Sequence, residues 1–174
     1  ANLTPLMLVR SFGGTESQDV FNLAVLEVAY SAGLVLGGVV IAMWGGPKNR
    51  LMLIVLAALG FGALSIGLGL SPNILVFFAC MGVLGIVAPF FGTSAMTLLQ
   101  ETVEPNRQGR VFGFVGIVTA LAMPLGMAIF GPMADVMPVE ALLVAAGILT
   151  FVVMGLALVL PAGRRALSAA RTPA

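Results

Sequence analysis

The chain has 174 residues, of which 60% are hydrophobic and only 9% are charged, and its mean hydropathy is +1.13. These values lie far outside the range of soluble globular proteins and indicate a membrane protein with a formal charge of +1. The chain has no His and one cysteine, Cys80, which excludes imidazole catalysis, Cys/His metal sites and an internal disulfide framework. We therefore expect no catalytic residues, no metal, no cofactor and no nucleic-acid partner, and we expect that the protein is not an enzyme.

Five apolar runs are each close to the roughly 20 residues that a helix needs to cross a bilayer. The sequence therefore predicts an all-α integral membrane protein, with spans at about 21–43, 51–70, 74–99, 111–134 and 139–160. The apolar opening, residues 1–9, is too short for a full span, and we interpret it as the truncated end of a sixth transmembrane helix. We expect that the natural chain is longer. We expect residues 161–174 to form a cytoplasmic tail.

The basic residues gather in alternate breaks between the spans, which predicts the orientation of the chain in a cell membrane. Arg10 is the only basic residue on the opposite side, which we expect to be non-cytoplasmic. The breaks and tail on the other side, including the carboxyl terminus, are expected to be cytoplasmic and to contact membrane lipid; their basic residues are Lys48, Arg50, Arg107, Arg110, Arg164, Arg165 and Arg171.

The spans differ in polarity. Runs 51–70 and 139–160 each have one hydroxyl well inside them, Ser65 and Thr150, and are expected to face lipid. The other three spans contain more polar side chains and are expected to line an interior cavity. The candidate cavity residues are Glu27, Tyr30, Ser31, Phe90, Thr93, Thr97, Thr119 and Met123.

Glycine and proline mark where the spans pack and bend. Gly33 and Gly37 form a GxxxG step that lets two helix backbones approach closely, and the Gly109, Gly113, Gly116 series is suited to the same use. Pro89 and Pro124 lie within spans and remove one backbone hydrogen bond each, which leaves a static bend and a functional hinge as alternatives.

Glu27 is the only acid well inside an apolar run, and an ionisable group in hydrocarbon is costly enough to suggest a functional role. One hypothesis is that its carboxyl carries a coupling proton. The alternative is that Glu27 lies near one end of its span, where interfacial water or a partner outside this chain can contact it.

Two motifs carry a resemblance to a known family. Gly37-Gly38 followed by Trp44-Gly45-Gly46-Pro47-Lys48-Asn49-Arg50 resembles the Gly-rich basic loop between the second and third helices of each half of the major facilitator superfamily. Four further segments, in order, resemble its macrolide-efflux branch, which consists of drug:proton antiporters: Leu99-Gln100, Gln108-Gly109-Arg110-Val111-Phe112-Gly113, Ala122-Met123-Pro124-Leu125-Gly126 and Gly131-Pro132-Met133-Ala134-Asp135.

The resemblance covers the chain to Leu160 and implies helices seven to twelve of a twelve-helix transporter, with the amino-terminal six-helix half outside this chain. It implies a secondary transporter that exports drugs or other amphipathic small molecules by alternating access, coupled to protons. The stretch from Gly126 to Pro132 is similar to a Gly-Pro motif of antiporters, although the spacing differs. The resemblance assigns conformational and loop roles to Gly37, Gly45, Gly46, Lys48, Arg50, Gly109, Arg110, Pro124, Gly126, Gly131, Pro132 and Asp135.

Two alternatives stay open at this point. A siderophore or metabolite exporter of the same superfamily fits these residues almost equally well. A non-transporting membrane scaffold or assembly protein belongs to a different class, and it needs neither the intramembrane acid Glu27 nor the prolines Pro89 and Pro124.

Overall fold

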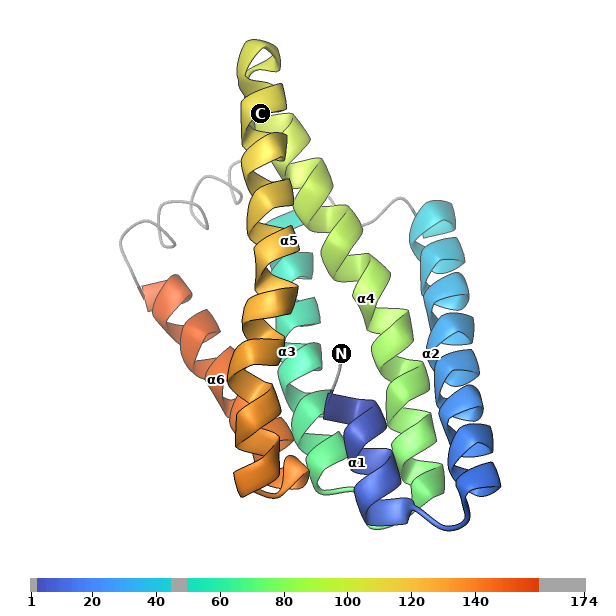
Figure 1. Ribbon diagram of the computed structural model, residues 1–174. Coiled ribbons are helices and arrows are strands. Elements are labelled where there is room, and N and C mark those ends of the chain that lie inside the picture. Colours follow the sequence, from blue (N-terminus) through green and yellow to red (C-terminus); the bar gives the residue numbers. More distant parts are fainter. Residues whose placement is uncertain (1–2, 45–49, 160–174) are drawn as a thin grey trace.

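The computed structural model describes residues 3–44 and 50–159, and the part of the chain that it describes is entirely helical between short turns. The short first helix is followed by five long ones (Figure 1). In chain order they are α1 (Leu3–Phe12), α2 (Glu16–Trp44), α3 (Arg50–Gly69), α4 (Ile74–Thr102), α5 (Pro105–Val136) and α6 (Val139–Val159). This confirms the predicted all-α fold with five long apolar helices.

The five long helices are long and apolar enough to cross a membrane. The shortest, α3, has 20 residues and therefore rises about 30 Å, which matches the hydrocarbon core of a bilayer. The longest, α5, has 32 residues and rises about 48 Å, so its ends extend past that core. By contrast, α1 has only 10 residues.

Successive helices run in opposite directions, so two sets of turns lie at opposite ends of the bundle (Figure 1). The α1–α2, α3–α4 and α5–α6 turns share the end that carries Arg10, which we call the Arg10 end. Arg50, Arg107 and Arg110 lie at the other end, where α3 and α5 begin. Residues Lys48, Arg164, Arg165 and Arg171 lie outside the described residues.

α2 and α4 pack with their backbones in direct contact, because each presents glycine to the other. A Cβ atom added to Gly33 would lie 2.2 Å from the Gly82 carbonyl oxygen, and one added to Gly37 would lie 2.3 Å from that of Ile86. The reciprocal position is Gly85, whose added Cβ would lie 2.3 Å from the Tyr30 carbonyl oxygen. The GxxxG step therefore packs as the sequence predicts.

α3 packs between α4 and α6, which differs from the expectation that its surface faces lipid. On the α6 side, an added Cβ at Gly147 would lie 2.6 Å from the Gly62 carbonyl oxygen. On the α4 side, the Phe61 and Phe91 rings meet edge to face with centroids 6.2 Å apart. Aliphatic composition alone cannot distinguish a lipid contact from a helix contact, because both surroundings are equally apolar.

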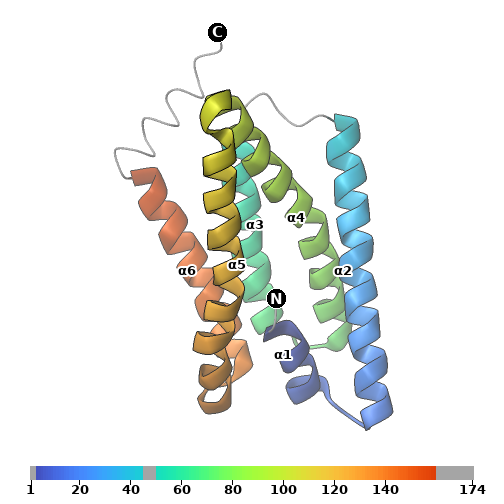
Figure 2. The ribbon, with the colours of Figure 1, turned by 45° about the horizontal axis from the view of Figure 1, so that its top comes forward.

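The hydrophobic core lies toward the Arg10 end and is built by all six helices. Phe77 of α4 is fully buried and contacts the Phe12 ring of α1, with centroids 5.9 Å apart. α1 lies between α5 and α2 in two different views (Figures 1 and 2). The buried members of the cluster are Met7, Leu8, Leu26, Leu68, Phe77, Met81, Ala134, Val139, Leu142 and Leu143.

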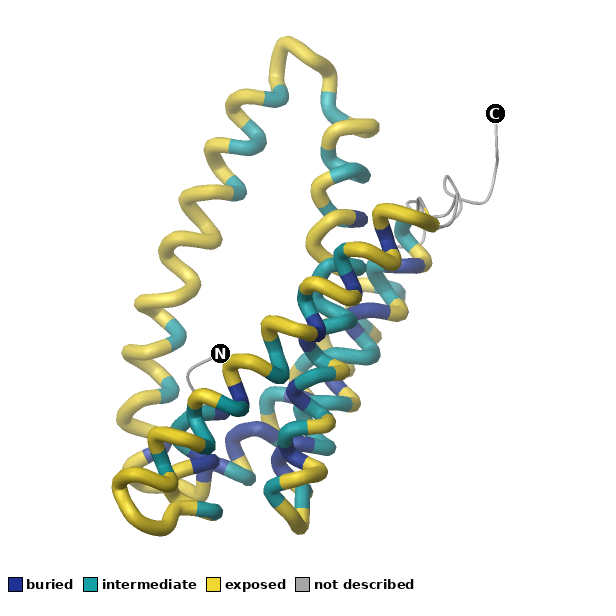
Figure 3. Tube along the Cα trace, turned by 90° about the vertical axis from the view of Figure 1, so that its right-hand side faces the viewer, coloured by how far each residue is buried: buried dark blue, intermediate teal, exposed yellow. Residues whose placement is uncertain are grey.

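α5 is the least buried helix, and its trace is coloured as exposed along most of its length (Figure 3). Ala134 is its only buried residue. No heavy atom of the described chain beyond the local backbone lies within 4 Å of a Cβ added at Gly109, Gly113 or Gly116. The close packing that the sequence suggests for these glycines is therefore not made by any described residue.

Candidate substrate cavity

Two hollows lie side by side in the bundle and share four lining residues, Thr4, Ser65, Leu143 and Ala146. The first, which we call the acidic chamber, has a volume of about 450 Å³ and contains Glu27. The second, which we call the thioether chamber, has a volume of about 600 Å³ and contains two methionines. Both volumes lie within the range of small-molecule sites, which are usually 300–1,000 Å³.

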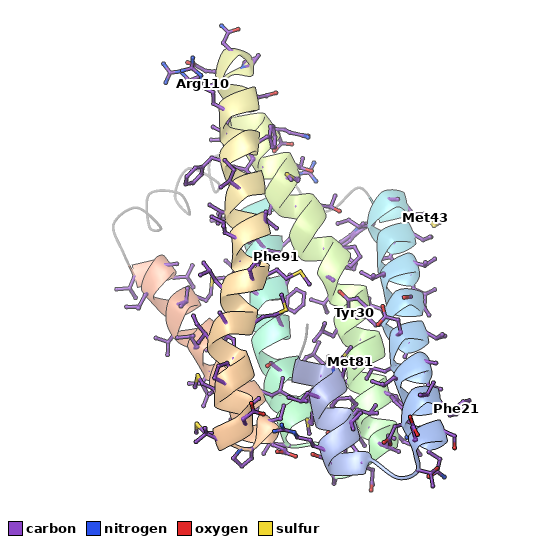
Figure 4. All side chains as sticks on the ribbon, in the orientation of Figure 1. Phe21, Tyr30, Met43, Met81, Phe91 and Arg110 are labelled. Atoms are coloured by element: carbon purple, nitrogen blue, oxygen red, sulfur yellow. The ribbon has the colours of Figure 1, made fainter. Side chains whose placement is uncertain are left out.

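The acidic chamber combines one carboxylate with aromatic and thioether groups. Glu27 and Tyr30 are three residues apart on α2, so they share one helix face. Figure 4 labels Tyr30 on α2 and Met81 on the adjacent α4, and both residues line this chamber. The part of the chain that the structure describes offers Glu27 no ion-pair partner. The remaining lining residues are Thr4, Pro5, Leu26, Phe61, Ser65, Leu68, Leu84, Leu143, Ala146 and Thr150.

The thioether chamber lies between α5 and the α1, α3 and α6 helices. Met123 and Met127 are four residues apart on α5 and face into it together with Phe130. Methionine side chains are flexible and polarisable, so such a wall adapts to apolar ligands of different shapes. The remaining lining residues are Thr4, Leu6, Ser65, Ala122, Gly126, Gly131, Ala134, Leu143 and Ala146.

Three hydroxyls bring polarity to the acidic chamber from helices that the sequence did not assign to it. Ser65 of α3 donates a 2.8 Å hydrogen bond to the Leu143 carbonyl of α6. Thr150 of α6 donates to the Ala146 carbonyl at 2.9 Å, and Thr4 of α1 is buried. The signal for Ser65 and Thr150 was their isolation in otherwise apolar runs, which sequence analysis interpreted as a sign of lipid contact.

The predicted cavity residues separate into two groups. Glu27 and Tyr30 line the acidic chamber and Met123 lines the thioether chamber. The others line neither chamber, and two of them donate within their own helix: Thr97 to the Thr93 carbonyl and Thr119 to the Val115 carbonyl, each at 2.8 Å. The cavity role of this second group stays a prediction; its members are Ser31, Phe90, Thr93, Thr97 and Thr119.

Comparison with known proteins identifies the family. The model of the Major Facilitator Superfamily matches residues 1–173, nearly the whole chain. The chain belongs to the major facilitator superfamily. Macrolide efflux protein A of Streptococcus pyogenes is 29% identical over 135 residues, which are 76% of this chain and 32% of that protein. Macrolide efflux protein A of Enterococcus faecalis is 29% identical over 127 residues, 72% of this chain and 38% of that protein.

This superfamily chain therefore spans about a third of the length of the curated relatives that it matches. No solved structure matches it. The family assignment confirms the resemblance that the glycine and arginine motifs indicate, and it identifies the chain as a multi-pass membrane protein of the transporter class.

Trp44 and Arg50, the described residues at the two ends of the superfamily loop motif, lie at the end of the bundle opposite Arg10. Arg50 forms an ion pair with Glu101 of α4 at 3.5 Å and so connects the start of α3 to the end of α4. Arg110 lies at the projecting end of α5 (Figure 4), next to Gly109. Gly45, Gly46 and Lys48 of the same motif lie outside the described residues.

The remaining motif residues of the superfamily resemblance are on α5. Pro124 and Pro132 lie inside the helix, which continues through both. Gly126 and Gly131 line the thioether chamber. Asp135 lies near the end of α5 and forms an ion pair with Arg10 of α1 at 3.0 Å, a contact that sequence analysis did not predict.

Proposed function

We propose that this chain is the carboxyl-terminal part of a secondary transporter that exports drugs or other amphipathic small molecules by alternating access, coupled to protons. The observation that carries the proposal is the acidic chamber, a hollow of an apolar helix bundle where a carboxylate without an ion-pair partner among the described residues lies beside a tyrosine. The names of the relatives support the export direction, since both are macrolide efflux proteins.

The two chambers suit a ligand with a cationic and an apolar part. A cation placed near Glu27 gains charge attraction, and the Tyr30 ring adds an aromatic face. The shared wall lets the apolar remainder of the same ligand enter the thioether chamber, beside Met123 and Met127. Such a site selects for amphipathic character more strongly than for a single shape.

Glu27 is proposed to couple export to protons. A carboxylate can bind either a proton or a cationic ligand, and the proposal is that the two compete for Glu27. When one displaces the other, a proton moving inward releases the ligand outward. The exchange requires only one acidic group that both species reach, and the place of Glu27 in the wall of the acidic chamber supports it as the candidate.

Alternating access requires a second bundle that moves against this one. We propose that the amino-terminal six-helix half, as a further part of the same polypeptide, supplies it and closes the cavity. The complete transporter is then a multi-pass protein of the cell membrane whose lipid-facing helices contact the bilayer. The distribution of Arg50, Arg107 and Arg110 against Arg10 supports a cytoplasmic carboxyl terminus.

The test is efflux of a fluorescent cationic or macrolide-like compound from cells that express the full-length parent protein. We expect that Glu27→Gln abolishes proton-gradient-dependent efflux at normal expression. The matched control is Glu16→Gln, an exposed acid at the start of the same helix, which should leave efflux unchanged. Unchanged efflux in Glu27→Gln would remove the proton role. No efflux in wild type would favour the siderophore exporter or the scaffold.

A further inference from the structure

We propose that Arg10 is a positioning residue that fixes the end of α5 and thereby sets where the thioether chamber stands relative to the acidic chamber. The inference starts from an imbalance in how α5 is held. Along its middle, α5 has no buried residue, although this part carries Met123 and Met127 of the chamber wall. Its polar attachments to other helices lie at its two ends in the described chain.

At the Arg10 end, one guanidinium makes two contacts with α5. Nη1 of Arg10 donates to the Ala134 carbonyl oxygen, and Nη2 forms the ion pair with Asp135 Oδ1 at 3.0 Å. The next residue extends the connection to α6, because the Ser11 hydroxyl donates to Glu140 Oε1. The end of α1 therefore holds the last turn of α5 and the first turn of α6 together.

The Ala134 carbonyl oxygen needs the Arg10 donor because a proline follows it four residues later in the chain. Within a helix it would accept the backbone N–H of the residue four positions later, but that residue is Pro138, which has no N–H. Ala134 is 1% exposed, so water cannot readily replace the missing donor. The preceding carbonyl, that of Met133, is satisfied by the Met137 N–H at 2.8 Å. Arg10 thus supplies the bond that Pro138 removes.

Arginine suits this position better than any other cation. Its guanidinium presents several N–H groups in a fixed plane, so it can bond a carbonyl and a carboxylate at once, whereas lysine is a single point charge. A cation at the carboxyl end of a helix also interacts favourably with the helix dipole. The ion pair with Asp135 is largely exposed, with 74% of the Asp135 side chain accessible, so by itself it contributes little to the stability of the fold.

The opposite end of α5 is held differently. Gln108 donates to the Gln100 and Val103 carbonyls at 3.1 and 3.2 Å, which connects α5 to the end of α4. α5 therefore extends between two end attachments. Loss of the Arg10 attachment frees one end, and the displacement is transmitted to Met123 and Met127 because the intervening helix has few contacts to oppose it.

The direct test measures the position of α5. Spin labels are attached to cysteines at the exposed positions Leu121 of α5 and Leu56 of α3, in a full-length protein with Cys80→Ser and no other reactive cysteine. We expect that Arg10→Gln shifts or broadens the distance distribution between the labels. Arg10→Lys should shift it less, because lysine retains one of the two contacts. A wild-type distribution in Arg10→Gln would overturn the proposal.

Two comparisons separate positioning from a general loss of charge. Arg107→Gln breaks a more exposed ion pair, with Glu104 at 3.4 Å, that lies within one turn and joins no two helices; it should leave the distribution unchanged. Asp135→Asn alters only an exposed carboxylate, so it tests the attachment of α5 to Arg10 even if Arg10→Gln fails to fold. We expect it to shift the label distances less than Arg10→Gln does. Arg10→Gln and Asp135→Asn combined should shift the distribution no further than Arg10→Gln alone.

The consequence for transport rests on the proposed function. We expect that Arg10→Gln slows efflux by a factor of about three, with Arg107→Gln equal to wild type. If wild type exports no test compound, the proposed function fails while the label distances still decide the role of Arg10. If the distances shift and efflux stays at the wild-type rate, Arg10 positions α5 without affecting transport, and the transport consequence is overturned.

Discussion

Ser65 and Thr150 illustrate how much of the site depends on single hydroxyl groups. Both line the acidic chamber, yet only one of the two hydroxyl groups donates its hydrogen bond to a second helix. Ser65 donates across the α3–α6 contact to Leu143, whereas Thr150 donates to a carbonyl of its own helix. An interhelical hydrogen bond in a membrane contributes on average about 0.6 kcal/mol and at most about 1.7. An intrahelical one holds no second helix in place.

We therefore predict that Ser65→Ala lowers the stability of the full-length protein by about 0.6 kcal/mol, because α3 loses its hydrogen bond to α6. The matched variant Thr150→Val should cost less. Thermal unfolding of the purified protein in detergent measures both. A larger loss for Thr150→Val than for Ser65→Ala would contradict this assignment of the two hydroxyls.

Sequence reasoning selected candidates whose signal is local and missed contacts whose partner is distant. Glu27 and Tyr30 stood out because a carboxyl or phenol in an apolar run is unusual whatever surrounds it. Arg10 was noticed only as the exception to the charge distribution. Its role depends on Ala134 and Pro138, more than a hundred residues later, and no periodicity along α1 contains that information.

At the scale of helices, two pairs are joined through backbone contact, α2 with α4 and α3 with α6. The sequence predicted the spans because bilayer thickness requires a minimum length of apolar helix. It also predicted that Gly33 and Gly37 pack closely. It could not predict the partner, since each of the other predicted spans contains glycines as well. The position of α3 between α4 and α6 was missed because lipid and a neighbouring helix are equally apolar surroundings.

The paired glycines Gly37 and Gly38 provide a test with an internal control. A Cβ at Gly37 would lie 2.3 Å from the Ile86 carbonyl oxygen, whereas one at Gly38 would have no atom within 4 Å in the described chain. We predict that Gly37→Val destabilises the protein by about 1–3 kcal/mol through overpacking, and that Gly38→Val costs much less. Thermal unfolding in detergent distinguishes the two, and equal losses would argue against the α2–α4 contact.

At the scale of the whole molecule, the apolar surface is distributed unevenly. Lipid requires an apolar exterior on every helix, but α5 exposes apolar residues on opposite faces: Phe114, Ile117, Val118, Leu121 and Leu125 on one, and Met123 and Met127 on the other. The chain spans about a third of its relatives' length, and the amino-terminal half is the partner that we propose for part of this surface. Transport then requires both halves.

We accordingly predict that this chain expressed alone supports no efflux, and that coexpression with the remaining part of the parent protein as a separate chain restores efflux to a measurable fraction. The assay is the same fluorescent export measurement. Expression of each part is checked in the membrane fraction, so that a missing protein is not read as missing activity. Efflux by this chain alone would contradict the need for a second bundle.

The contact between α2 and α4 also limits which sequences this fold accepts. At Gly33, Gly37 and Gly85 a single methyl group would enter the space of a carbonyl oxygen on the neighbouring helix, so only one of the twenty amino acids fits without moving that helix. At Gly92, about two turns beyond Gly85 on α4, no atom of the described chain lies within 4 Å of an added Cβ, so many side chains fit. Random substitution should therefore be tolerated very unevenly among glycines that look equivalent in the sequence.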